Sequence, residues 1–135
     1  MKRTYSELIK LETFKERFDY LKLSGSVGSA TFGGHRYINQ AFYQSDEWKK
    51  IRRFCILRDC GCDLALPGYD IQSKLTLHHI NPVTIEQVMR VDRALLDPEN
   101  LVCCSYMTHK AIHFSDDRLL PFEPVERHPG DTKLW

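Results

Sequence analysis

The chain reads Leu75-Thr-Leu-His-His-Ile-Asn-Pro82 and, shortly afterwards, Leu101-Val-Cys-Cys-Ser-Tyr-Met-Thr-His-Lys-Ala-Ile-His113. Each stretch opens with a short apolar run of strand length, and Asn81-Pro82 ends the first run as a turn. The second run continues into a segment of helical character. We therefore expect an α+β unit made of a strand at 75–80, a strand at 101–104 and a helix at 107–114.

Four of the six histidines fall inside this unit. His109 and His113 are spaced i, i+4, so both rings project from one face of a helix and can converge on one ion or phosphate. His78 and His79 are neighbours on a strand, where side chains alternate in direction. Adjacent histidines do not easily ligate the same ion, but one can hold a metal while the other faces an attacking water.

This combination suits phosphodiester hydrolysis. A histidine can act as general base near pH 7, and a divalent cation can neutralise the charge that grows on the phosphate and the leaving oxygen. Either histidine pair alone is more often part of the surface or the core, without a functional role. Their joint occurrence, with Asn100 in the turn between the two strands, favours a functional site.

The motif segments resemble those of a known enzyme family. His78-His-Ile-Asn-Pro82, Asp97-Pro-Glu-Asn-Leu101 and Thr108-His-Lys-Ala-Ile-His113 are similar, in order and separation, to the three segments of HNH endonucleases. The resemblance implies a metal-dependent DNA endonuclease with a ββα-metal (His-Me finger) core, N-terminal helices and an extended C-terminal tail. The likeness extends to a phage-encoded HNH group through Tyr20-Leu21, Thr31-Phe-Gly33, Asn39-Gln-Ala-Phe-Tyr43, Trp48, Arg58-Asp59, Gly61-Cys-Asp-Leu64, Asp131-Thr132 and Trp135.

The resemblance implies a role for each motif residue. His78 and His109 would be metal ligands, and His113 would be either a further ligand or a phosphate contact. His79 would be the general base, and Asn100 would hydrogen-bond the loop backbone and orient His79. The implied cofactor is one divalent ion (Mg²⁺ or Mn²⁺, with Zn²⁺ or Ni²⁺ as alternatives), and the implied products carry 5′-phosphate and 3′-hydroxyl ends.

One departure from the family concerns its second, structural metal. Many HNH proteins hold a structural zinc with two Cys-x-x-Cys pairs, and the second pair falls here on Ser105 and Thr108. Cys103 and Cys104 lie out of register with those positions. We expect no structural zinc and expect hydrophobic packing, to which the N-terminal helix could contribute, in its place.

DNA binding would need a local concentration of positive charge, because the formal net charge is only +1. A predicted helix supplies one, since its residues 49, 52 and 53 fall on one side and residue 50 lies beside them. The alternative is a solvated helix face, because Asp46 and Glu47 are close by. The candidate phosphate contacts are Lys49, Lys50, Arg52, Arg53, Arg58 and Lys110.

Capping signals predict three helices outside the motif. They are a helix from the Thr13 capping box to about residue 23, a helix capped by Ser45 that runs to residue 58, and a short helix from the Thr84 capping box through residue 89. At 135 residues we expect one globular domain. We divide it into a helical and loop extension (1–44), a nuclease core (45–120) and a proline-containing tail (121–135).

The expected compartment is the cytoplasm, which would be the host cytoplasm for a phage protein. The chain has no apolar run long enough to span a bilayer and no signal-peptide core at its N-terminus. Its five cysteines, an odd number, are compatible with a reducing environment.

Two other functions are compatible with the same residues. The first is a non-catalytic DNA-binding module with a structural zinc, against which the missing Cys-x-x-Cys pairs and the spare histidine beside His78 count. The second is a degenerate HNH fold that serves in phage packaging or assembly, although no motif residue is missing. By resemblance to the phage relatives, a working nuclease could also dock to packaging proteins such as terminase.

Overall fold

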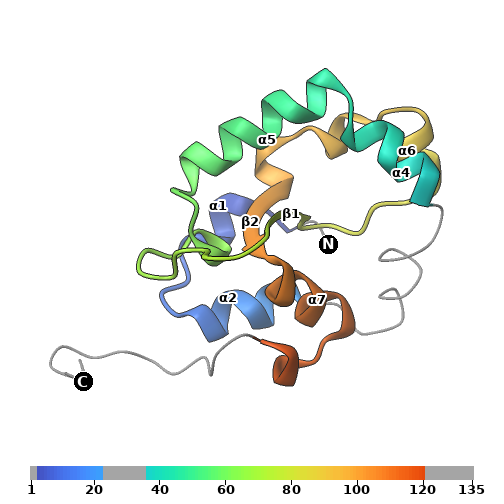
Figure 1. The fold of residues 1–135 in the computed structure, drawn as a ribbon. Helices are drawn as coiled ribbons and strands as arrows, with labels where there is room; N and C mark the ends of the chain where they lie inside the picture. Colours follow the sequence, from blue (N-terminus) through green and yellow to red (C-terminus); the bar gives the residue numbers. More distant parts are fainter. Residues whose placement is uncertain (1–2, 23–35, 121–135) are drawn as a thin grey trace, which may run out of the picture.

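The computed structural model describes residues 3–22 and 36–120 of the chain, so part of the expected extension at 1–44 and all of the expected tail at 121–135 lie outside the described residues (Figure 1). The described part combines α-helices and short 3₁₀ turns with a two-stranded sheet, which confirms the α+β class. In chain order the elements are α1 (Tyr5–Leu8), α2 (Phe14–Leu21), α4 (Arg36–Tyr43), α5 (Asp46–Arg58), η1 (Asp63–Ala65), β1 (Leu75–His79), α6 (Ile85–Met89), η2 (Arg93–Leu95), η3 (Pro98–Asn100), β2 (Leu101–Ser105), α7 (Tyr106–Phe114) and η4 (Asp117–Leu119).

The sheet is an antiparallel ribbon of β1 and β2. Leu75 lies opposite Ser105 and His79 lies opposite Leu101, so the end of β1 meets the start of β2. The strand β2 runs directly into α7, and the Ser105 hydroxyl caps that helix by accepting from the Thr108 amide. The two predicted strands and the predicted helix are thus present, each within one residue of its expected bounds.

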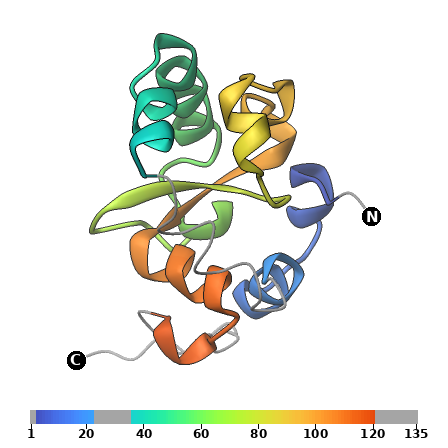
Figure 2. The same cartoon turned by 90° about the vertical axis from the view of Figure 1, so that its right-hand side faces the viewer.

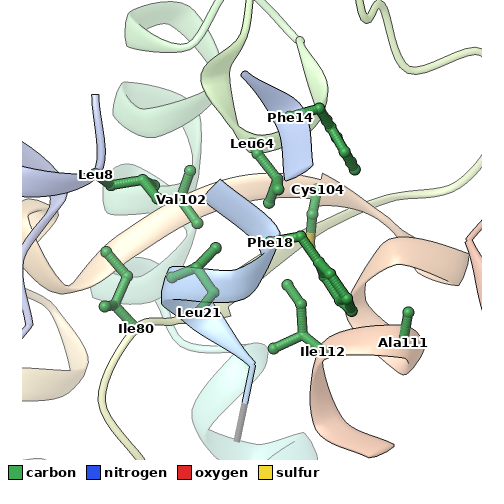
Figure 3. Packing of buried hydrophobic residues seen from close by; sticks show 10 residues of the cluster. All are labelled: Leu8, Phe14, Phe18, Leu21, Leu64, Ile80, Val102, Cys104, Ala111 and Ile112. Carbon is green, nitrogen blue, oxygen red and sulfur yellow. The ribbon is translucent and has the colours of Figure 1, made fainter. Parts of the chain in front are cut away.

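The ribbon is buried on both faces, which places it between two groups of helices (Figure 2). Alternate residues of the strands contribute to each side, as strand geometry requires. The face toward α4 and α5 packs Phe42, Trp48, Cys55, Leu77, Val88, Leu95, Leu101 and Cys103. The face toward α2 and α7 packs Leu8, Phe14, Phe18, Leu21, Leu64, Ile80, Val102, Cys104, Ala111 and Ile112 (Figure 3).

The predicted capping signals mark real helix starts. Thr13 and Thr84 each form a complete capping box, and the Ser45 hydroxyl accepts from the Trp48 amide. The apolar stripe of α2, formed by Phe14, Phe18 and Leu21 at i, i+4 and i+7, is buried. The helices α1 and α4 were not predicted. The four residues of α1 are too few to be stable alone, and tertiary contacts hold them, such as the bond from the Tyr5 hydroxyl to Asp59.

A polar cluster lies at Ser105 and Thr108, the positions where the resemblance to HNH proteins would place ligands of a structural zinc. The buried carboxylate of Asp63 accepts hydrogen bonds from the Thr108 hydroxyl at 2.7 Å and the Ser105 amide at 3.2 Å. The Ser105 hydroxyl in turn donates to the Thr108 hydroxyl at 3.0 Å. The cluster joins η1 to the start of α7 by hydrogen bonds, in addition to the hydrophobic packing of this region.

None of the helices in residues 3–22 and 36–120 combines the length and the apolar character that crossing a bilayer demands.

Candidate metal centre and general base

Three histidines converge between β1 and α7. The donor nitrogens of His78, His109 and His113 all lie within 4.8 Å of one another, the one such group among the described residues. The ring of His78 lies 5.3 Å from each of the other two rings, centroid to centroid. The Nε2 atoms of His109 and His113 are 2.9 Å apart. These three side chains could therefore hold one metal ion.

The local structure explains why these rings meet. His78 belongs to the set of β1 residues that faces α7, and the i, i+4 spacing places both helix histidines on the side of α7 that faces the ribbon. The position of α7 is set at its first turn by the Ser105 cap and by the bond between Thr108 and Asp63. Thr108 precedes His109 directly, so the polar cluster also fixes the position of the first helix ligand.

The His78 ring is buried without a hydrogen-bond partner in the part of the chain that the structure describes. The residue is only 1% exposed, and neither ring nitrogen has a hydrogen-bond partner among the described residues. Leaving a buried polar group unpaired is costly, so native structures rarely do so without reason. A divalent ion between His78, His109 and His113 would engage one of these nitrogens, which gives the unpaired ring a physical explanation.

The protonation state of the three rings also suits metal binding. Burial is the main cause that lowers the pKa of His78 well below its ordinary value, with repulsion from His109 and His113 adding to it. Burial likewise lowers the pKa of His109 to about 3 and that of His113 to about 4. All three imidazoles are therefore neutral at pH 7, which is the form that ligates metals.

The spacing of the nitrogens is close to that of ligands on one ion. Nitrogens about 2.1 Å from a shared ion lie about 3.0–3.4 Å apart at octahedral or tetrahedral angles. The 2.9 Å between the Nε2 atoms of His109 and His113, which form a hydrogen bond with each other in this structure, is just below this range. Three nitrogen ligands would leave coordination positions for water or a phosphate oxygen, as catalytic sites require.

His79 lies on the opposite face of β1, against α5. Its ring stacks on Trp48 with the centroids 5.5 Å apart, and its Nε2 lies 3.1 Å from the carbonyl oxygen of Leu95. Because a carbonyl only accepts hydrogen bonds, Nε2 carries the proton and Nδ1 keeps a lone pair in the neutral ring. Burial lowers the pKa of His79 to about 4, against the opposing effect of the Leu95 bond. The ring is therefore a neutral proton acceptor of defined tautomer.

Asn100 is buried and acts on His79 through the backbone. Its Nδ2 donates to the Ala94 carbonyl at 2.9 Å, and its Oδ1 accepts from the Asn81 amide at 2.9 Å. Ala94 is the neighbour of Leu95, whose carbonyl accepts the His79 proton. Asn100 does not bond His79 directly; it holds the loop that does.

Comparisons with known proteins return no match. No protein-family model, no curated protein and no solved structure matches the chain.

The candidate DNA-binding residues of α5 are accessible. Lys49, Lys50 and Arg53 are exposed and Arg52 is partly buried. Among the described residues none of the four forms an ion pair, so the neighbouring Asp46 and Glu47 do not neutralise them directly. Trp48, which precedes them on the same helix, is buried and stacks on His79. Lys110 lies partly buried on α7, next to His109.

Arg58 has a structural role in place of the expected DNA contact. Its guanidinium pairs with Asp59 at 2.8 Å and donates to the carbonyls of Pro98 and Leu101, each at 2.7 Å. It also lies over the Tyr5 ring, 3.5 Å from the centroid. Because all of these partners belong to the protein interior, we remove Arg58 from the candidate phosphate contacts.

Two residues that support the site were missed in the sequence. Asp63 accepts a hydrogen bond from Thr108 in the first turn of α7, and Asn81 donates one to Asn100. Asn81 was interpreted only as a turn residue before Pro82. For Asp63, the vacant zinc-ligand positions Ser105 and Thr108 were the available signal, since two hydroxyl residues in a core need a buried partner.

Proposed function

We propose that this chain is a metal-dependent DNA endonuclease of the HNH type, with β1, β2 and α7 as its ββα-metal core. The observation that supports the proposal most strongly is the unpaired, buried ring of His78, which faces His109 and His113. A second histidine, His79, follows His78 on β1 and projects from the other face of the strand, with its proton held on Nε2. The combination supplies both a cation site and a base.

The residues divide the hydrolysis of a phosphodiester between them. His78, His109 and His113 would hold a divalent cation, whose charge supports the pentavalent phosphate and the departing 3′ oxygen. The Nδ1 atom of His79 takes a proton from the water that attacks phosphorus in line. The Nε2–H of His79 stays on the Leu95 carbonyl, so the ring keeps its orientation and its charged form is stabilised.

The donor set favours some ions over others. Three imidazole nitrogens suit Zn²⁺, Ni²⁺ and related transition ions, whereas Mg²⁺ prefers oxygen ligands and retains its waters. Among the described residues no carboxylate joins the three-histidine group. We therefore expect Ni²⁺, Zn²⁺ or Mn²⁺ to support activity at lower concentration than Mg²⁺.

The basic side of α5 would hold the DNA backbone. Lys49, Arg52 and Arg53 share one side of the helix, which adjoins the buried side where Trp48 contacts His79. A duplex bound along α5 would then present a phosphate near the base. Such contacts are independent of sequence and weaken as salt rises.

Plasmid nicking tests the proposal. Purified protein is treated with a chelator and then supplied with Mg²⁺, Mn²⁺, Ni²⁺ or Zn²⁺. The same series is carried out on His79→Ala and on a control variant, Gln72→Ala, at an exposed loop position. We expect the parent and Gln72→Ala to convert supercoiled to open-circle DNA only with metal. We expect His79→Ala to lose this activity, because it lacks the base.

Two results would contradict the endonuclease. One is the absence of cleavage with every ion; the other is cleavage by His79→Ala at the parent rate. Tightly retained zinc without cleavage would instead favour the non-catalytic zinc module. A folded protein that neither cleaves nor retains metal would favour the packaging or assembly function.

A further inference from the structure

Asn81 joins the N-terminal segment of the chain to the end of β1. Its Oδ1 accepts from the Arg3 amide at 2.9 Å, and its Nδ2 donates to the Arg3 carbonyl at 2.8 Å. One side-chain amide thus pairs with both backbone groups of a residue 78 positions away in the sequence. The same Nδ2 also donates to Asn100 Oδ1 at 2.7 Å.

The hydrogen bonds continue from Asn81 to the base. Asn100 Oδ1 accepts from the backbone and the side chain of Asn81, and Asn100 Nδ2 donates to Ala94. The next carbonyl, of Leu95, accepts from His79. An uninterrupted series of hydrogen bonds and one peptide unit therefore connects Arg3 to the His79 ring.

The direction of each bond in this series is determined. Backbone amides only donate and backbone carbonyls only accept, so the Arg3 backbone fixes which end of the Asn81 side chain is the oxygen. The Asn81 amide and the Ala94 carbonyl fix the orientation of Asn100 in the same way. Neither asparagine can rotate its amide by half a turn without losing several bonds, so the series has one low-energy arrangement.

The N-terminal segment is itself held firmly. The Arg3 guanidinium donates to the carbonyls of Tyr20 and Leu21 at the end of α2, and the Ser6 amide donates to Glu99. Leu8 is fully buried in the core that contains Ile80 (Figure 3). Arg3 is thus a fixed point against which Asn81 can be positioned.

We propose that Asn81 is a positioning residue for the general base, and that the N-terminal segment completes the active site through it. The catalytic consequence rests on the proposed endonuclease function. The coupling between Arg3 and the His79 ring is a property of the fold and has a separate readout. Asn81 does not touch the metal ligands in any described hydrogen bond, so its loss should leave the three-histidine group intact.

The principal test compares Asn81→Ala with the parent in the full chain. The orientation of His79 is read from the ¹⁵N shifts of its ring in long-range ¹H–¹⁵N spectra, which distinguish the protonated nitrogen from the free one. We expect the parent to show Nε2–H, and the variant to show averaging between the two tautomers. Ni²⁺ affinity should be unchanged, while kcat for nicking falls by about tenfold or more, as for other supporting residues of metal sites.

A second pair of variants alters the other end of the series. Arg3→Pro removes the amide that donates to Asn81, whereas Arg3→Ala keeps this amide and removes only the guanidinium bonds. We expect Arg3→Pro to reproduce the His79 averaging and Arg3→Ala to retain the parent spectrum. Thr84→Ala removes the capping box of α6 in the same connection and serves as a control for general loosening.

The outcomes separate the two proposals. If the parent cuts no DNA, the endonuclease fails, but the His79 spectra of Asn81→Ala and Arg3→Pro still decide the coupling. Parent-like His79 shifts in both variants overturn the inference, as does equal averaging in Thr84→Ala. If Asn81→Ala does not fold, Arg3→Pro alone decides. Averaging of the two His79 tautomers in Arg3→Pro would support the inference, and parent-like His79 shifts would contradict it.

Discussion

At the scale of single residues, His78 makes the metal-free protein less stable than its packing would allow. Its ring is buried with both nitrogens unpaired among the described residues, and such a group costs about 1–3 kcal/mol. A ligand that binds only the folded state adds about 2.7 kcal/mol at one hundred times its dissociation constant. A metal ion bound to His78 should therefore raise the free energy of unfolding substantially, because it removes the cost of the unpaired ring and binds only the folded state.

We predict that Ni²⁺ or Zn²⁺ raises the melting temperature of the parent by several degrees, as measured by differential scanning calorimetry. His78→Leu, which replaces the ring with an apolar side chain, should melt at or above the metal-free parent and should lose the response to metal. His79→Ala is the matched control at the neighbouring position and should keep the response. A metal-induced rise in His78→Leu equal to that of the parent would place the ion elsewhere.

At the scale of elements, the local signals in the sequence predicted the elements around the site well. Capping boxes at Thr13 and Thr84 and the cap at Ser45 depend on residues three apart, so they can be recognised without a structure. The i, i+4 spacing of His109 and His113 is local in the same sense. The motif thus predicted which rings would share a face.

The contacts that hold those elements could not be predicted in this way. Asn81 pairs with Arg3 and Asp63 pairs with Thr108 across long stretches of sequence. The sequence around Asn81 is that of a turn at the end of a strand, and it gives no sign that the side chain also joins two distant segments of the chain. Arg58 was misinterpreted for the same reason, because its partners at Pro98 and Leu101 become visible only when the chain is folded.

The attachment of α7 depends on Asp63, and this can be tested separately from the chemistry. Asp63→Ala would leave the Thr108 hydroxyl and the Ser105 amide without their buried acceptor, at a cost of about 1–3 kcal/mol for each unpaired group. We predict lower stability in urea unfolding together with weaker Ni²⁺ binding, because Thr108 precedes His109. Gln72→Ala, at an exposed position of the same connection, is the control and should change neither quantity. Undiminished Ni²⁺ affinity in a folded Asp63→Ala would show that the cluster does not position the ligands.

The basic residues of α5 should make DNA binding depend on salt concentration. Lys49→Ala and Arg53→Ala should each weaken DNA binding and reduce the slope of log affinity against log salt by about one, if each contacts one phosphate. Fluorescence anisotropy with a labelled duplex, in the presence of a chelator to prevent cutting, measures this slope. Lys74→Ala, whose ammonium lies 5.5 Å from the Tyr106 ring on another part of the molecule, removes the same charge as a control. Equal slopes in all three variants would mean that α5 is a solvated face.

At the scale of the whole molecule, a buried ionic group connects segments that are far apart in the sequence. The carboxylate of Asp59 accepts from Arg58, from the Tyr5 hydroxyl at 2.8 Å and from the Cys103 amide at 2.9 Å. These bonds join α1, the end of α5 and β2. The Asp59 side chain is fully buried and that of Arg58 is 17% exposed, so solvent screens the pair only weakly.

This group should support stability and contribute nothing directly to DNA binding. Asp59→Ala leaves the Arg58 charge without its partner, and breaking a buried pair in this way costs about 3–5 kcal/mol. Arg118→Ala breaks a pair whose arginine is 86% exposed, so solvent screening should make its effect on stability much smaller than that of Asp59→Ala. Urea unfolding measures both costs.

Arg58→Ala should likewise lower stability while leaving the salt slope of DNA binding at the parent value, in contrast to Arg53→Ala. A reduced slope with unchanged stability would return Arg58 to the DNA interface and remove it from the core.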